Sequence, residues 1–119
     1  MEKVHIPDLL ARIPDYWNPR IVGELNGQHV KLAKLKGEFI WHAHADEDEM
    51  FLVLKGELTM EFRDRSIHLK EQDFLIVPRG VEHRPVAVGE VAVMLFEPAS
   101  TLNTGDVRNE LTRDELERL

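Results

Sequence analysis

Residues 37–49 of the 119-residue chain read Gly37-Glu38-Phe39-Ile40-Trp41-His42-Ala43-His44-Ala45-Asp46-Glu47-Asp48-Glu49. Side chains two apart on a β-strand point to the same face, so His42 and His44 can reach one ion together. The acidic residues after His44 read as a turn, which brings Glu49 back beside the two histidines on the next strand. One carboxylate with several imidazoles suits a divalent transition metal: Fe, Mn, Ni, Co or Zn. This stretch therefore predicts a metal site between two β-strands.

A second stretch supplies a fourth donor. It reads Asp73-Phe74-Leu75-Ile76-Val77-Pro78-Arg79-Gly80-Val81-Glu82-His83, a strand followed by a turn and a histidine. Pro78 ends the strand and Gly80 permits a turn that other residues resist, so this turn can aim His83 at the same ion. Four protein ligands leave two positions open on an octahedral ion, where substrate or dioxygen can bind.

The expected metal ligands are therefore His42, His44, Glu49 and His83. Asp48 is the alternative acidic ligand by spacing alone, although it faces away from the side of the strand that carries Glu49.

Together the two stretches resemble the two motifs of the cupin superfamily. The first reads G-x4-H-x-H-x4-E-x6-G and ends at Gly56, and the second reads x-D-x4-P-x-G-x2-H and ends at His83. The resemblance implies an all-β jelly-roll barrel of roughly six to eight strands with the metal inside it. It is strongest to the small, stand-alone, single-domain bacterial cupins, which are loosely similar to sugar-phosphate isomerases.

Three positions depart from the family pattern. The spacing from Gly37 to His42 is one residue shorter than the pattern has, Gln72 stands where the second motif begins with glycine, and Ala87 stands in place of its asparagine. None of them is a ligand position, so they put the subfamily in doubt and leave the barrel and the metal site standing.

Short apolar segments separated by turn residues run from Ile21 to Pro98 and predict the strands of a sandwich or a closed barrel, of which the cupin resemblance implies the barrel. Asn26-Gly27 is a strong hairpin signal between the first two segments. The expected strands cover residues 21–25, 28–35, 39–43, 50–54, 58–62, 67–69, 74–77, 85–88 and 91–96.

The two ends of the chain are expected to differ from the barrel at 21–98. Residues 1–20 form an N-terminal segment with one short helix over Ile6–Ile13, which Pro14 stops. Residues 99–119 form a polar C-terminal tail that begins as an extended stretch. Within it, Thr112 and Glu115 make a weak capping-box signature, so residues 113–118 form either a short helix or a frayed end.

Composition excludes several classes of function. The formal net charge of −7 argues against nucleic acid and against anionic membranes as partners. The chain has no cysteine, which excludes disulfides, thiolate metal sites and cysteine nucleophiles. No apolar run approaches the roughly 20 residues of a membrane helix, and the N-terminus lacks the apolar run of a signal peptide. A soluble cytoplasmic protein is the expectation.

Period-two alternation assigns a second face to the same strands. If the two histidines point inward, then Phe39, Trp41 and Ala43 point outward. If Glu49 points inward, so do Phe51 and Val53, and the side chains left outside are Met50, Leu52 and Leu54. Large apolar patches mark interfaces, so we expect a homodimer; the alternative is that the N-terminal segment covers this sheet.

The remaining titratable residues give no clear catalytic group. Glu38 shares the inward face by alternation and is expected near the barrel rim. His5, His29 and His68 match no motif and are interpreted as surface residues. No general acid or base is assigned.

Two main hypotheses for function remain open, because one fold hosts many reactions. The first is a metal-dependent enzyme acting on a small organic substrate, for which the cupin resemblance implies a dioxygenase, isomerase, decarboxylase or lyase. The second is a non-catalytic module that binds or senses a small ligand. A barrel with an incidental metal is disfavoured, because burying several imidazoles with a carboxylate is costly unless they are paired or metallated.

Overall fold

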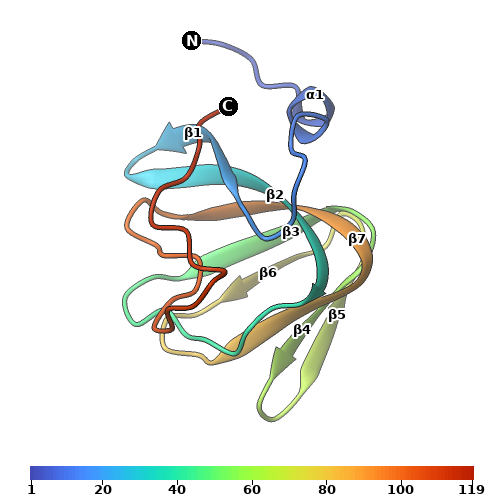
Figure 1. Cartoon of the computed structure of the whole chain (residues 1–119), viewed down its shortest axis with the longest axis vertical. Helices are drawn as coiled ribbons and strands as arrows, with labels where there is room; N and C mark the ends of the chain where they lie inside the picture. Colours follow the sequence, from blue (N-terminus) through green and yellow to red (C-terminus); the bar gives the residue numbers. More distant parts are fainter.

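The computed structural model describes residues 1–119 and contains one short helix, seven strands and a long C-terminal segment without helix or strand (Figure 1). The elements are α1 (Ile6–Leu10), β1 (Arg20–Leu25), β2 (Gln28–Glu38), β3 (Glu49–Lys55), β4 (Leu58–Phe62), β5 (Ser66–Leu69), β6 (Phe74–Val77) and β7 (His83–Pro98). No helix has the length and apolar character needed to span a lipid bilayer.

All strand pairs are antiparallel. The main path through the sheet runs β1-β2-β7-β3-β6, while β4 pairs with β5 and with the first half of β7. β7 therefore passes from one side of the barrel to the other, pairing with β2 along most of its length and with β3 in its second half. The predicted all-β jelly-roll barrel of the cupin type is confirmed.

The barrel interior explains why these segments form strands. Residues that alternate along β2, β3 and β7 point inward and make one buried apolar cluster, which includes Ala33, Leu35, Phe51, Val53 and Val93. β7 carries four valines, a residue type that favours strands, and β2 begins after the tight turn at Asn26-Gly27.

Three predicted elements differ in the structure. The helix ends at Leu10, because its last turn tightens into the bonds Arg12 N–H to Leu9 O and Ile13 N–H to Leu10 O. The two strands predicted at 85–88 and 91–96 are one strand, β7, because its pairing with β2 continues on both sides of the predicted turn. The strand predicted at 39–43 is absent, and only a bridge between His42 and His83 remains there.

The C-terminal segment is ordered against the barrel, so the predicted helix over 113–118 and the frayed end are both wrong. Ile21 N–H donates to Glu117 O and Leu119 N–H donates to Ile21 O, which makes a parallel bridge beside β1. The capping-box hydroxyl of Thr112 instead accepts from Asn109 N–H and pairs with Thr104 Oγ1. The chain end thus returns to the start of the barrel (Figure 1).

Candidate metal centre

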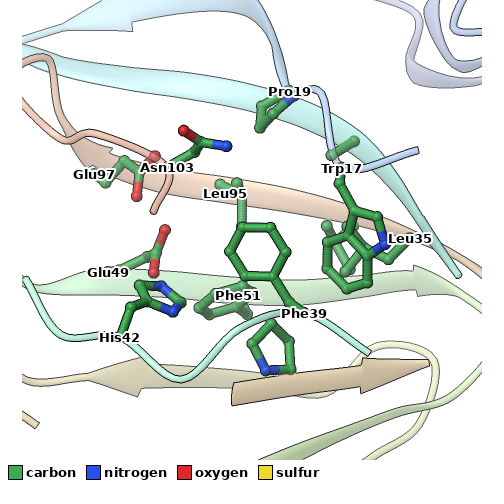
Figure 2. Close-up of a pocket in the computed structure, with 13 residues that line it drawn as sticks. Trp17, Pro19, Leu35, Phe39, His42, Glu49, Phe51, Leu95, Glu97 and Asn103 are labelled. Carbon is green, nitrogen blue, oxygen red and sulfur yellow. The ribbon is translucent and has the colours of Figure 1, made fainter. Parts of the chain in front are cut away.

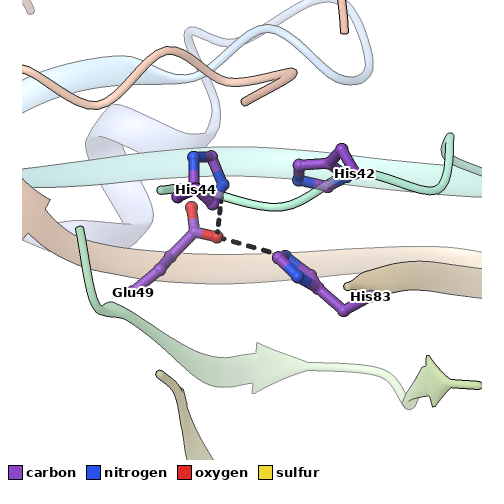
Figure 3. Close-up of side chains that lie close together, drawn as sticks. All are labelled: His42, His44, Glu49 and His83. Atoms are coloured by element: carbon purple, nitrogen blue, oxygen red, sulfur yellow. Dashed lines mark ion pairs between the residues drawn. The ribbon is translucent and has the colours of Figure 1, made fainter. Parts of the chain in front are cut away.

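The structure brings together the four side chains that the sequence singled out. His42, His44, Glu49 and His83 are all buried, and one donor atom from each lies within 4.8 Å of the others (Figure 3). Two donors of one ion, each about 2.1 Å from it, are at most about 4.2 Å apart. The four donors are therefore near enough for an inward shift of the side chains to bring them onto a common ion.

Backbone hydrogen bonds tie the histidines to one another. His42 N–H donates to His83 O at 3.1 Å, and His83 N–H donates back to His42 O at 2.9 Å. Gly80 N–H, in the turn before His83, donates to His44 O at 2.7 Å. The two motifs are thus joined directly through their main chains, and this fixes the spacing of the three rings.

The imidazole tautomers suit a metal. The Nδ1 atoms of His42 and His83 each lie 2.9 Å from a backbone carbonyl oxygen, of Ile40 and Val81 respectively. A carbonyl can only accept, so both Nδ1 atoms carry the proton, and the Nε2 lone pairs of the neutral rings are left to bind an ion.

Several of the donor atoms are buried without a hydrogen-bond partner: His44 Nδ1, His44 Nε2, His83 Nε2 and Glu49 Oε1. Glu49 Oε1 lies 3.3 Å from His44 Nε2 and 3.6 Å from His83 Nε2 (Figure 3). These distances are short enough for an ion pair, but neither contact has the geometry of a hydrogen bond. Buried polar atoms left unpaired are costly, and a cation among them would satisfy one nitrogen of His44 together with His83 Nε2 and Glu49 Oε1. The residues present therefore fit a divalent metal.

The environment shifts the pKa values of two of these groups. Burial of the ring, followed by the charge that a protonated His83 would carry, lowers the pKa of His42 to about 4. Burial by itself would raise the pKa of Glu49, but contacts with Glu97, His44 and His83 outweigh it and hold that pKa well below its usual range. Near neutral pH the site thus offers a neutral His42 ring and a charged Glu49 carboxylate.

The alternative acidic residues have other roles. Asp48 is exposed and accepts hydrogen bonds from the backbone N–H of Arg79 at 2.8 Å and from its side chain, so it holds the turn that precedes His83 and is not the acidic ligand. Glu38 is also exposed and pairs with Arg84 at 3.4 Å, so the prediction that it faces inward is wrong. Asp48 is an example of an acidic residue that organises the site without facing it.

Phe39 departs from the period-two alternation expected of its strand. This side chain is buried, stacks on Trp17 and lies edge-on to His42, whereas period-two counting predicts that it points outward. The register of β2 shifts between Leu35 and Gly37, and no strand continues past Glu38. Period-two alternation therefore does not determine which way the side chains after Glu38 point. Trp41 does point outward, where the Arg63 guanidinium lies 3.9 Å from its ring centroid.

The other histidines divide into two groups. His5 and His68 are exposed, as predicted, but His29 is buried on β2 opposite Glu97, so its interpretation as a surface residue is wrong.

Sequence reasoning missed a buried charge pair beside the site. Lys31 Nζ on β2 lies 2.7 Å from Glu97 Oε1 on β7, and both side chains are almost fully buried. Burial, then the charge of the neighbouring Glu49, raises the pKa of Glu97 well above its usual range, although Lys31 opposes this. A signal was present: each residue continues an inward period-two series, Lys31 with Ala33 on β2 and Glu97 after Leu95 on β7.

The C-terminal segment also approaches the site unexpectedly. Asp106 N–H donates to Ala43 O, and Ala43 N–H donates to Asp106 Oδ1, each at 3.0 Å. Gly105 lies so close that a Cβ there would stand 2.3 Å from Ala43 O and 3.1 Å from the His42 ring. These contacts supply the partners that a neighbouring strand would otherwise give residues 42–44.

Known proteins share this architecture. The family model of the cupin domain matches residues 28–97. The chain is 41% identical to a cupin-2 domain containing protein from Shewanella frigidimarina NCIMB 400, with a TM-score of 0.79 over 80% of this chain and 93% of that one. Protein NMB1881 from Neisseria meningitidis is 30% identical, with a TM-score of 0.76 over 82% of this chain and all of that one (100%).

A curated relative is also similar. The chain is 45% identical over 64 residues to the uncharacterized protein YdbB of Bacillus subtilis (strain 168), a match that covers 53% of this chain and 57% of YdbB. The matched region is thus little more than half of that relative. The family match covers well over half of the chain and both cupin motifs, and the chain therefore belongs to the cupin domain family.

Proposed function

We propose that this protein is a metal-dependent enzyme that acts on a small organic substrate, by a dioxygenase or isomerase type of reaction, at a centre of three histidines and one glutamate. The ligands are His42, His44, Glu49 and His83, and the metal is one divalent ion from the group Fe, Mn, Ni, Co and Zn. One observation carries the proposal: four buried donor atoms within 4.8 Å of one another, several without any other partner.

Each protein group has a definable part in such a centre. The Nδ1–H bonds to backbone carbonyls orient the rings of His42 and His83. Glu49 contributes a negative charge that offsets part of the charge of a divalent ion. When bound, such an ion supplies Lewis acidity toward substrate oxygens, and iron or manganese would add redox chemistry. Phe39 and Phe51 pack edge-on to His42 and His83 and limit the access of water on that side.

The test begins with element analysis of protein purified without added metal. We expect close to one divalent transition metal ion per chain, and oxygen uptake or isomer formation with at least one member of a substrate panel. A second outcome is metal at that level with neither oxygen uptake nor product for any member of the panel. That result would reject the enzyme and favour the alternative function, a non-catalytic cupin that binds a small ligand. Folded protein that retains no transition metal would contradict both.

We also propose that two chains associate through the outer face of β3 and β6. Phe74 and Ile76 are 61% and 54% exposed, and they stand opposite Leu52 and Met50 in the pairing of the two strands, so four apolar side chains share this face. Light scattering should give about twice the chain mass of 13.8 kDa at micromolar concentration. A mass near 13.8 kDa would refute the dimer.

A further inference from the structure

A pocket opens beside the metal centre, inside the barrel (Figure 2). Its space for water-sized spheres is about 40 Å³. One water needs about 10–15 Å³ by this measure, so the pocket holds about three waters, or roughly 90 Å³ of liquid volume. That is the size of one small ring or a short branched chain.

The walls of this pocket are apolar and include three aromatic rings. Trp17 and Phe39 stack with their centroids 4.8 Å apart and form one side. Phe51, Leu35 and Leu95 form the floor and the opposite side (Figure 2). A molecule bound at the metal centre would therefore place its body against hydrocarbon, where a hydroxyl-rich molecule would lose its hydrogen bonds to water.

The polar groups of the pocket gather at one end and include no cation. They are His42, Glu49, Glu97 and Asn103, and no arginine or lysine lines the pocket. The nearest ammonium, Lys31, is buried against Glu97 at 2.7 Å and so is already paired. A phosphate needs arginine, lysine or a set of backbone N–H donors. Here it would instead meet two carboxyl groups.

We propose that this pocket binds a small, mainly apolar molecule that carries an oxygen donor at one end and no phosphate or other fixed anionic group. The proposal rests on the proposed metal centre, since the ion would bind that oxygen, and it narrows the proposed function. Sugar phosphates, which the likeness to sugar-phosphate isomerases would suggest, do not fit the walls or the charges.

Three probes of similar size separate the contributions of apolar surface and charge: catechol, glycerol and phosphoglycolate. Calorimetric titration of the protein loaded with zinc, a redox-silent ion, should give catechol an affinity about tenfold or more above the other two, because its ring replaces water against the apolar walls. Catechol can also chelate zinc through its two oxygens, so the same order of affinities must hold in chelator-treated protein. Phosphoglycolate binding as tightly as catechol, or more tightly, would overturn the proposal. So would glycerol matching catechol.

Two further measurements place the binding in this pocket. Ala33→Leu fills the pocket from β2 and should weaken catechol about tenfold or more, while Ala99→Leu adds the same side chain on the surface and should change nothing. The second measurement does not depend on how Ala33→Leu folds. In Trp41→Phe, Trp17 is the one remaining tryptophan, and catechol should change its fluorescence with the affinity found by calorimetry. No fluorescence change at saturating catechol would overturn the assignment.

The experiments distinguish a wrong assignment of the pocket's ligand from a wrong assignment of the metal centre. Zinc retained by the protein tests the centre, whereas the order of the three affinities tests the pocket. Because that order comes from the walls and charges of the chain, it should persist in chelator-treated protein with lower affinity for catechol. Zinc retained with the order reversed would remove this inference and leave the proposed function intact.

Discussion

The four donor side chains stand on two kinds of backbone. Glu49 and His83 each begin a regular strand, β3 and β7, and are held by sheet pairing. His42 and His44 lie on a segment with no strand, whose backbone groups bond to His83, to Gly80 and to Asp106. One half of the site is therefore part of the barrel, and the other half is assembled from separate parts of the chain.

Because of this difference, substitutions in the two halves of the site should affect stability and metal binding to different degrees. Changes on the strand side should affect both the barrel and the metal site, because the same side chains pack the interior. Changes to the contacts that hold residues 42–44 should weaken metal binding more than they weaken the fold.

The largest effect should come from His83→Ala. His83 is fully buried, so its removal leaves a cavity that costs about 3 kcal/mol of unfolding free energy. It also removes one ligand, and metal affinity should fall by about 100-fold or more. Thermal melts and calorimetric metal titrations check both effects. The control is His68→Ala, whose side chain is exposed; equal effects in the two variants would contradict the placement of His83.

Gly105→Ala should have the second largest effect, and it should lower metal affinity more than it lowers stability. The added Cβ would stand 2.3 Å from Ala43 O, so the C-terminal segment must move away from residues 42–44. We expect about a tenfold loss of metal affinity, measured by competition with a chromogenic chelator.

Gly27→Ala is the matched control for Gly105→Ala. Gly27 also has a positive φ, +77° against +58°, but nothing lies within 4 Å of the position that a Cβ would take there. It should therefore cost about 1 kcal/mol of stability from backbone strain alone and leave metal affinity unchanged. If Gly27→Ala lowered metal affinity as much as Gly105→Ala does, the contact between the C-terminal segment and residues 42–44 would not be the cause of the loss.

Lowering the pH should destabilise the chelator-treated protein through His42. Its pKa falls from 6.5 to about 4 on folding, so between these values the unfolded chain binds more protons. The stabilisation is present above pH 6.5 and is lost as the pH falls toward 4, with an upper limit of about 3 kcal/mol. Melts from about pH 7.5 to about pH 4 should show a steeper loss in the wild type than in His42→Ala. Identical slopes would contradict this assignment.

The smallest effect should come from Asp106→Ala. This change removes the acceptor for Ala43 N–H but keeps the bond from Asp106 N–H to Ala43 O. An exposed hydrogen bond contributes about 1 kcal/mol, so metal affinity should drop about fivefold. Asp114→Ala, which removes another exposed carboxylate of the same segment, should leave metal affinity unaltered; a loss as large as that in Asp106→Ala would point to a general charge effect.

The strand side of the site could be predicted from the sequence because its rules are local. The turn at Pro78 and Gly80, the return of Glu49 beside the two histidines, and the hairpin at Asn26-Gly27 each depend on a few neighbouring residues. The strands themselves begin at Glu49 and His83, one and two residues before the predicted starts at 50 and 85. The spacing of short apolar segments predicted a sandwich or a barrel, and the resemblance to the cupin motifs implied the barrel.

The other side could not be predicted, because its partners are distant in the sequence. Phe39 turned inward after a register shift in β2, and Gly105 meets Ala43, a residue far away in the sequence. Lys31 and Glu97 are recognisable in the sequence as charged residues within inward-facing series, but only the pairing of β2 with β7 shows that their side chains meet.

The four-ligand metal centre is tested most directly by calorimetric titration of chelator-treated protein with zinc, in the wild type, in Glu49→Gln and in His44→Ala. One of the two ligands changed begins a regular strand and the other lies on the irregular segment. We predict one zinc per chain in the wild type and loss of that binding in both variants, with circular dichroism showing the barrel intact. One zinc per chain with unchanged affinity in both folded variants would contradict the assignment of this site.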